Sequence, residues 1–270
     1  MLIMLNQRIA LGVEYDGTPY HGWQIQKNGI SIQEMLQNAL SKVANEKIGI
    51  IGSGRTDAGV HALGQVVHFD TTTLRTHEAW VVGTNTFLPK DIRVRWIKEV
   101  PSTFNARRSA IARSYRYVIY CDPISPGIHR QGVTWVYSTL DIEKMSEAAQ
   151  FFIGEHDFSS FRASGCQAKT PFRRIISMTV KKVGQCIFID VVGNAFLHHM
   201  VRNFAGVLIA VGRAKKPVEW ALEVLLAKDR RYAGVTAPAC GLYLMNIEYP
   251  PDFELPQHEP RAWFFDGNGL

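Results

Sequence analysis

The spacing of apolar residues divides the chain into two successive runs of elements. Alternating or β-branched stretches predict strands, and apolar residues that recur every three or four positions predict helices. The strands of the first run are expected at residues 9–15, 48–51, 66–69 and 92–97, and its helices at 32–43 and 77–87. The second run predicts strands at 115–120, 175–183, 186–192 and 242–249, with helices at 142–152, at 196–211 and from Pro217 onward.

Polar residues mark several of the expected boundaries. Ser31 and Glu34 have the spacing of a capping box before the first helix, and Asp141 is a candidate cap for the helix that follows it. Gly184-Gln185 is expected to close a hairpin between two strands of the second run. Between the expected elements, a long polar and basic loop is predicted from Gly154 to Arg173.

The order strand, helix, strand, strand, helix, strand occurs twice along the chain, with one extra helix in the second run. This order predicts an α+β protein made of two ferredoxin-like βαββαβ halves, with mainly antiparallel sheets and helices on one face. The expected divisions are an N-terminal half at residues 1–105, a C-terminal half at 106–250 and an irregular tail at 251–270. A cleft between the two halves is the expected position of an active site.

Composition narrows the class of protein. Hydrophobic residues make up 46% and charged residues 20%, which is typical of a folded chain. The 30 Lys and Arg against 24 Asp and Glu give a net charge of +6 and favour an anionic partner. The four cysteines have no CxxC spacing, the N-terminus lacks the pattern of a signal peptide, and no stretch approaches the ~20 apolar residues of a membrane helix. We therefore expect a cytoplasmic protein.

The candidate chemistry lies in the glycine-rich stretch Gly54-Arg55-Thr56-Asp57-Ala58-Gly59-Val60-His61. Glycine marks places where the backbone turns sharply or approaches another group closely. The stretch matches neither a dinucleotide-binding fingerprint nor a P-loop. His198 and His199 are adjacent and would point about 100° apart on a helix, so the pair does not predict a metal site. Elimination leaves the Asp57 carboxylate, beside the Arg55 cation, as the candidate reactive group.

A simpler interpretation of Asp57 stays open at this point. Aspartate is common in turns, where its carboxylate accepts hydrogen bonds from nearby backbone. On residue chemistry alone, Asp57 is therefore either a turn former with Arg55 as a solvated neighbour or a reactive group held ionised by that arginine.

The same stretch resembles the signature of the tRNA pseudouridine synthase A (TruA) family. The resemblance runs from about residue 8 to residue 250, and its motifs follow one another in the family's order. The further matching segments are Glu14-Tyr15-Asp16-Gly17, Gly22-Trp23-Gln24, Arg113-Ser114-Tyr115-Arg116-Tyr117, Asp157-Phe158-Ser159-Ser160-Phe161-Arg162, His198-His199-Met200-Val201-Arg202-Asn203 and Gly241-Leu242-Tyr243-Leu244.

This resemblance implies an enzyme that converts uridine to pseudouridine at positions 38, 39 and 40 of the tRNA anticodon arm, as a homodimer and without metal or organic cofactor. It implies that Asp57 is the nucleophile, that Arg202 pairs with it and that Tyr115 packs on the target base. Arg55 is expected to occupy the gap left by the flipped uridine or to position a phosphate. Arg113 and Arg162 are the other expected substrate contacts.

Further basic residues are candidates for phosphate contacts, although each alone is more typical of a solvated surface charge. They are Arg107, Arg108, Lys169, Arg173 and Arg174. Phe158 and Phe161 are interpreted as buried loop anchors rather than as base-stacking groups. The alternatives to the family reading are a synthase acting on another RNA site and a non-catalytic RNA-binding module. The role of residues 254–270, with Trp263-Phe264-Phe265, stays open.

Overall fold

The computed structural model describes residues 6–256, and these form two compact units. The first unit combines the chain up to Ile111 with the segment from Leu244 onward, and the second runs from Ala112 to Tyr243. Trp263-Phe264-Phe265 and most of the predicted tail lie outside the described residues. Among the described residues, no helix has both the length and the apolar composition that a membrane crossing requires.

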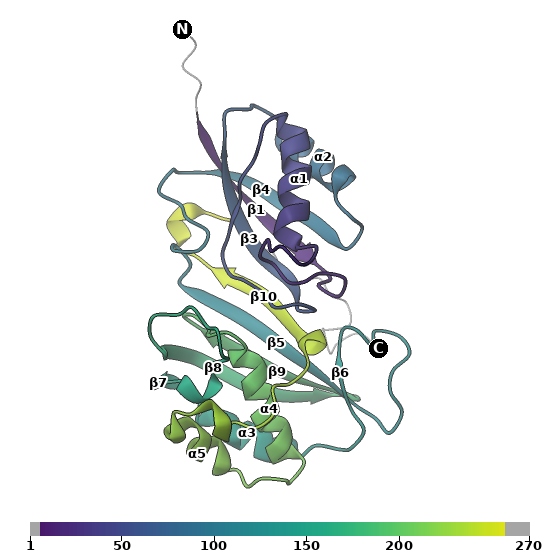
Figure 1. Ribbon diagram of the computed structural model, residues 1–270, viewed down its shortest axis with the longest axis vertical. Helices are drawn as coiled ribbons and strands as arrows, with labels where there is room; N and C mark the ends of the chain where they lie inside the picture. The colour runs from purple at the N-terminus through teal and green to yellow at the C-terminus, as the bar shows by residue number, and fades with distance from the viewer. Residues whose placement is uncertain (1–5, 257–270) are drawn as a thin grey trace. The chain divides into compact units, whose positions relative to one another are not determined.

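The first unit is a sheet with two helices (Figure 1). Its strands occur in the order β4-β1-β3-β10, and the short β2 also pairs with β3. The pairs β1–β3, β1–β4 and β2–β3 are all antiparallel. Its elements are β1 (Gln7–Tyr15), α1 (Ile32–Ala44), β2 (Ile51–Gly52), β3 (His61–Thr71), α2 (His77–Phe87), β4 (Ile92–Val100) and the end of β10 (Leu242–Glu248).

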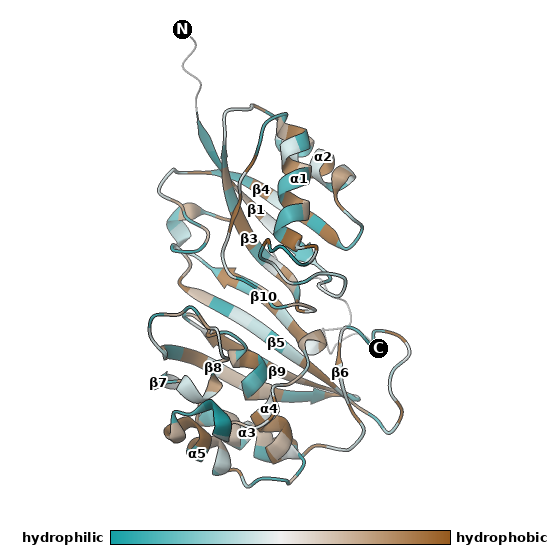
Figure 2. Cartoon of the chain, viewed as in Figure 1, coloured by the Kyte–Doolittle hydropathy of each residue, from teal (hydrophilic) through white to brown (hydrophobic). Residues whose placement is uncertain are grey.

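The predicted helix beginning after Ser31 is confirmed as α1. The Ser31 side chain accepts a hydrogen bond from the Glu34 backbone N–H, which satisfies one of the free donors at the helix start. Hydrophilic and hydrophobic residues alternate around this helix in Figure 2, and Leu36 and Leu40 on its apolar side are fully buried. Burying a leucine side chain stabilises the fold by roughly 1.5–3 kcal/mol, so this face fixes the helix on the sheet.

The second unit also combines mainly antiparallel strands with helices. Its main strands occur in the order β5-β9-β8-β7, with antiparallel neighbours, and the short β6 pairs in parallel with β5. Its elements are β5 (Ala112–Cys121), β6 (Thr134–Val136), α3 (Ile142–Gln150), β7 (Gly154–Asp157), η1 (Ser159–Phe161), β8 (Phe172–Val183), β9 (Cys186–Gly193), α4 (Met200–Gly212), α5 (Trp220–Ala227), η2 (Arg230–Tyr232) and η3 (Ala239–Gly241). The predicted α+β class is confirmed.

Three predicted elements are wrong at their boundaries. Of the strand predicted at 48–51, only Ile51 pairs, because Ile48 and Ile50 instead bury their side chains beneath α1 and their N–H groups bond to α1 side chains. The helix predicted at 196–211 begins at Met200, because His199 has a φ of 62°, which cannot continue a right-handed helix. After Pro217 the chain first makes a turn, closed by Trp220 N–H to Pro217 O, and α5 begins at Trp220.

The long loop predicted from Gly154 to Arg173 is also wrong. Residues 154–157 form β7, which pairs with the beginning of β8, and Ser159–Phe161 form a 3₁₀ turn. The strand escaped prediction because its sequence, Gly-Glu-His-Asp, is short and polar. The predicted hairpin at Gly184-Gln185 is confirmed between β8 and β9.

Candidate active site

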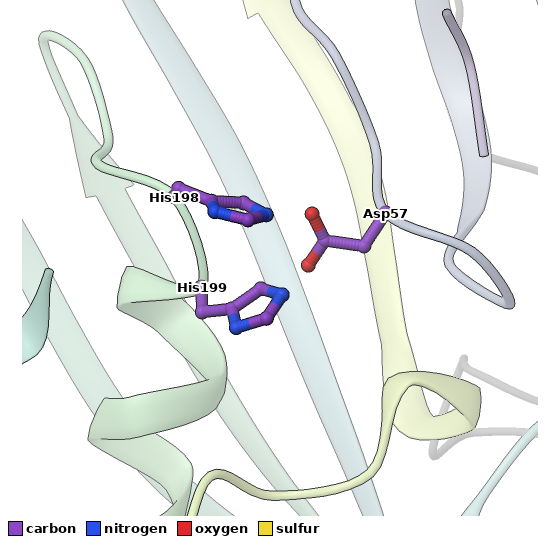
Figure 3. A group of neighbouring side chains, drawn as sticks. All are labelled: Asp57, His198 and His199. Carbon is purple, nitrogen blue, oxygen red and sulfur yellow. The ribbon is translucent and has the colours of Figure 1, made fainter. Parts of the chain in front are cut away.

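Asp57 lies on the loop that connects β2 to β3 in the first unit. Its side chain is half-buried, Arg55 is exposed and Thr56 between them is buried. The Asp57 backbone carbonyl accepts a hydrogen bond of 3.1 Å from Val60 N–H, and Gly59 within this turn has a φ of 76°. The loop therefore turns directly after Asp57 and displays its carboxylate, drawn in Figure 3.

Gln65 of β3 holds the start of this loop. Its buried side chain lies 2.5 Å from the Ser53 hydroxyl, which donates to Oε1, and its Nε2 donates to the Gly54 carbonyl at 3.0 Å. Ser53 N–H donates to Val66 O at 2.9 Å. The Ser53 hydroxyl and the Gln65 side chain are buried, so water cannot replace a lost partner. Breaking their hydrogen bond would therefore leave a buried polar atom without a hydrogen-bond partner.

Thr56 is held from two sides. Its hydroxyl lies 2.8 Å from the Tyr15 hydroxyl, and its carbonyl accepts from Trp23 N–H at 3.0 Å. Gly22, next to Trp23, has a φ of 89°, and a Cβ there would lie 2.6 Å from the Thr56 carbonyl oxygen. The glycine is therefore required both by its backbone conformation and by the close approach to the loop.

The end of the loop is held by the turn that follows β1. His61 is buried, and its Nδ1 lies 3.0 Å from Asp16 Oδ1. The contact with His61, together with hydrogen bonds from Thr18, holds the pKa of the Asp16 carboxyl well below its usual range. A Cβ on Gly17 would lie 2.0 Å from the Val60 carbonyl oxygen. The turn thus packs directly against the backbone between Asp57 and β3.

Tyr115 belongs to β5 in the second unit. It is half-buried, and its ring packs edge-on against Phe196 with centroids 5.0 Å apart. Tyr117 and Ile119 on the same strand are fully buried. These two residues therefore belong to the core of the unit, and Tyr115 lies at its margin with part of its surface accessible.

His198 and His199 precede α4, so the expectation that helix geometry would separate their rings is wrong. Their ring centroids lie 4.0 Å apart, and Figure 3 shows the two imidazoles side by side at the start of the helix. His198 is exposed and His199 is half-buried.

Arg202, the predicted partner of Asp57, and the predicted substrate contacts Arg113 and Arg162 donate to backbone carbonyls of the second unit. Arg202 Nε donates to Ala237 O at 2.9 Å, Arg113 Nη1 donates to Asn194 O at 2.7 Å, and Arg162 Nη2 donates to both Cys166 O and Ala168 O at 2.8 Å. These bonds orient each guanidinium, whose N–H donors point in fixed directions within one plane.

Asp57 belongs to the first unit, whereas Arg202 and Tyr115 belong to the second. The pairing of Asp57 with Arg202 stays a prediction. Arg107, Arg108, Lys169 and Arg174 are exposed, as phosphate contacts require, and Arg173 is half-buried. Phe158 and Phe161 are fully buried, which confirms their interpretation as loop anchors.

Asn203 was given no role from the sequence, yet it organises the surroundings of Arg202. It is fully buried; its Nδ2 donates to Phe161 O at 2.7 Å, and its Oδ1 accepts from Thr236 Oγ1 at 2.7 Å and from Arg230 at 3.1 Å. An asparagine within an apolar helix is the signal that identifies such a group, because a buried amide needs partners. Tyr15, Thr56 and Gln65 gave no comparable signal.

Comparison with known proteins adds independent information. A family model described as tRNA pseudouridine synthase matches residues 12–107 and 148–250. The tRNA pseudouridine synthase A of Pseudoalteromonas atlantica is 57% identical over 250 residues, which cover 93% of this chain and 95% of that protein. The tRNA pseudouridine synthase A of Pseudomonas aeruginosa is 55% identical over 261 residues, which cover 96% of this chain and 92% of that protein.

Likeness to solved structures is much weaker. A chain from a structure of an H/ACA ribonucleoprotein bound to a substrate RNA containing 2′-deoxyuridine has a TM-score of 0.36 and 13% sequence identity. The match covers 74% of this chain and 44% of that chain. A likeness this distant supports no conclusion about the fold or the site.

Proposed function

The chain belongs to the tRNA pseudouridine synthase family, and on that premise we propose that it converts uridine to pseudouridine at positions 38, 39 and 40 of the tRNA anticodon arm. The observation that supports this most is 57% identity over 93% of the chain to a tRNA pseudouridine synthase A. The half-buried Asp57, on a loop held at both ends, supplies a suitable reactive group.

The reaction replaces the bond from the ribose to a nitrogen of uracil by a bond to a carbon of the same base. The bond from C1′ to N1 of uracil breaks, the base rotates, a bond forms from C1′ to C5, and C5 loses its proton. An ionised Asp57 can assist either by adding to the base or by capturing C1′, and both routes require a carboxylate without its proton. The proposal includes no metal and no organic cofactor.

The other side chains take the roles that the resemblance assigns. Arg202 offsets the charge of the desolvated carboxylate, and Tyr115 packs on the target base. Arg55, exposed beside Asp57, fills the gap left by the flipped uridine or binds a phosphate, which helps to offset the few kcal/mol of lost stacking. Arg113 and Arg162, which their carbonyl bonds orient, contact the tRNA.

The finer architecture belongs to the same proposal. The antiparallel order β4-β1-β3-β2 in the first unit supports a ferredoxin-like βαββαβ half with a very short second strand. The order β5-β9-β8 supports a second such half. We further propose that the protein acts in the cytoplasm and as a homodimer. Gel filtration with light scattering tests the oligomeric state: twice the mass of 30.4 kDa is expected.

The decisive experiment compares wild type with Asp57→Asn on transcribed tRNA, with Asp252→Asn as an exposed control in the same unit. Tritium release from uridine labelled at C5 measures the reaction. The wild type and the control are expected to release tritium, and Asp57→Asn is expected to lose at least about a thousandfold in rate. Pseudouridine formed by Asp57→Asn at the normal rate would remove Asp57 from the mechanism.

The two alternatives give different outcomes. A non-catalytic RNA-binding module would bind tRNA and release no tritium even as wild type. A synthase for another site would leave positions 38, 39 and 40 modified in tRNA from cells that lack the protein. Mapping pseudouridine in such cells therefore tests the proposed position independently of the proposed nucleophile.

A further inference from the structure

The end of β1 contacts the Asp57 loop on both sides of the nucleophile. Tyr15 reaches Thr56, immediately before Asp57, and the turn at Asp16 and Gly17 reaches the backbone from Val60 to His61. All of these residues belong to the first unit, and Tyr15 lies more than 40 positions earlier in the chain than Thr56. The contacts therefore come from folding rather than from local sequence.

The sheet is irregular beside Tyr15. In the ladder between β1 and β3, Val13 pairs with Gln65 but Tyr15 pairs with Ala62, so β3 contains one extra residue across from β1. A bulge of this kind bends the strand that carries the extra residue, so β3, which leads out of the Asp57 loop, bends where it faces Tyr15. The Tyr15 ring packs 6.0 Å from the Trp23 ring, and only 3% of the residue is exposed. Its hydroxyl is thus held rigidly against Thr56.

We propose that Tyr15 is a positioning residue, which sets the orientation of the Asp57 carboxylate through its hydrogen bond to Thr56. This inference rests on the proposed function, in which Asp57 is the nucleophile. Thr56 is joined to Asp57 by one peptide bond, so rotation of the Thr56 backbone displaces the carboxylate. Reacting groups displaced by about 1 Å lose up to about a hundredfold in rate, so a small rotation is enough to matter.

The test uses four variants and one control variant of the full chain on transcribed tRNA, with kcat and KM measured well below the unfolding temperature. Tyr15→Phe and Thr56→Val each remove one hydroxyl of the pair, and the double variant removes both. Thr56→Ser keeps a hydroxyl at the same position and serves as the rescue variant. Tyr249→Phe is the matched control, because it removes a tyrosine hydroxyl bonded to the Ala106 carbonyl elsewhere in the first unit.

The expected results separate positioning from binding. Tyr15→Phe and Thr56→Val are each expected to lower kcat about tenfold with KM for tRNA within about twofold of wild type. The double variant is expected to be no slower than the slower single variant, because both substitutions remove the same hydrogen bond. Thr56→Ser and Tyr249→Phe are expected to keep kcat within about twofold of wild type.

Several outcomes would overturn the inference. In the first, the double variant loses the product of the two single losses in kcat. In the second, KM rises while kcat is unchanged. In the third, the fall in the activity of Tyr15→Phe equals the fall in its folded fraction. If the wild type forms pseudouridine and Tyr15→Phe keeps its kcat, the inference fails and the proposed function stands. If the wild type forms no pseudouridine in tRNA, the proposed function fails first.

Discussion

The loop from Ser53 to Val60 in the first unit and the segment from Phe158 to Pro171 in the second contain no α-helix or β-strand, yet different forces fix them. The first is held by hydrogen bonds from Tyr15, Trp23 and Gln65 and by two glycines that let the backbone approach closely. The second is anchored by aromatic rings that enter the core.

The aromatic anchor is a cluster of four fully buried phenylalanines. Phe204 of α4 lies at its centre, with ring centroids 4.8 Å from Phe152, 5.5 Å from Phe158 and 4.7 Å from Phe161. Aromatic pairs in tilted or edge-on arrangements add to the stability gained from burial. Apolar packing is tolerant of direction, whereas hydrogen bonds fix both distance and angle. The loop that presents a reactive carboxylate is the one fixed by hydrogen bonds.

Removing the central ring should produce the largest effect. Phe204→Ala is expected to lower the free energy of unfolding by about 3–5 kcal/mol, because the cavity would be lined by three rings that cannot collapse into it. Urea unfolding measures the change. Phe172→Ala is the control, since that ring is 56% exposed. Equal losses for the two variants would show that the cluster is not the anchor.

Acid should lower the stability of the first unit, because that unit buries the imidazole of His68. The four phenylalanines of the aromatic cluster carry no group that binds a proton. Burial and the nearby Arg8 charge lower the pKa of His68 to about 4. In the unfolded protein His68 binds a proton near pH 6.5, whereas in the folded protein it does so only near pH 4. The free energy of unfolding therefore falls as the pH drops from 6.5 towards 4. The loss is about 3 kcal/mol. Urea unfolding of His68→Gln across this range should show a flatter pH dependence, and an unchanged slope would contradict the assignment.

A methyl group at Gly17 should disturb the hydrogen-bonded loop but not the aromatic segment. The added Cβ would lie 2.0 Å from Val60 O, a backbone atom that cannot yield easily. Gly17→Ala is expected to lower the free energy of unfolding by about 1–3 kcal/mol and to slow pseudouridine formation by up to about a hundredfold. Gly49→Ala is the control, because a Cβ there meets nothing within 4 Å. Equal activity of the two variants would argue against the packing described.

The smallest expected effect is at the start of the loop. Ser53→Ala removes one partner of the buried Gln65 side chain and leaves its Oε1 without the Ser53 donor. The free energy of unfolding is expected to fall by about 1–3 kcal/mol, towards the lower end if Gln65 rotates. Hydrogen exchange at the amide of residue 53, which donates to Val66 O, is expected to quicken, while exchange in residues 158–161 is unchanged. Faster exchange in both regions would indicate a global rather than a local loss.

Helices with clear caps and periodic apolar faces could be predicted from the sequence. Ser31, Thr76 and Asp141 each cap a helix in the structure, and the helix at 77–87 has the predicted bounds. The start of α4 could not be predicted, because the left-handed conformation of His199 depends on tertiary contacts that periodicity does not reveal. β7 was missed because pairing with β8, rather than its own polar residues, makes it a strand.

The candidate site also has residues that could be predicted from the sequence and residues that could not. Residue chemistry singled out Asp57, and the resemblance added Tyr115 and Arg202. Neither method could find that Tyr15 bonds to Thr56, because folding brings together two residues that lie 41 positions apart in the chain. Side chains that support a reactive group have ordinary identities, so only their positions reveal them.

The path of β10 has a consequence for how the protein is made. This strand leaves the second unit at Tyr243 and completes the sheet of the first unit beside β3. A ribosome therefore releases β1, β3 and β4 long before the last strand of their sheet exists. At bacterial-type rates of about 5–20 residues per second, the wait is on the order of ten seconds. During that interval part of the β3 edge is open to other chains, and chains truncated before Leu244 would keep it open permanently.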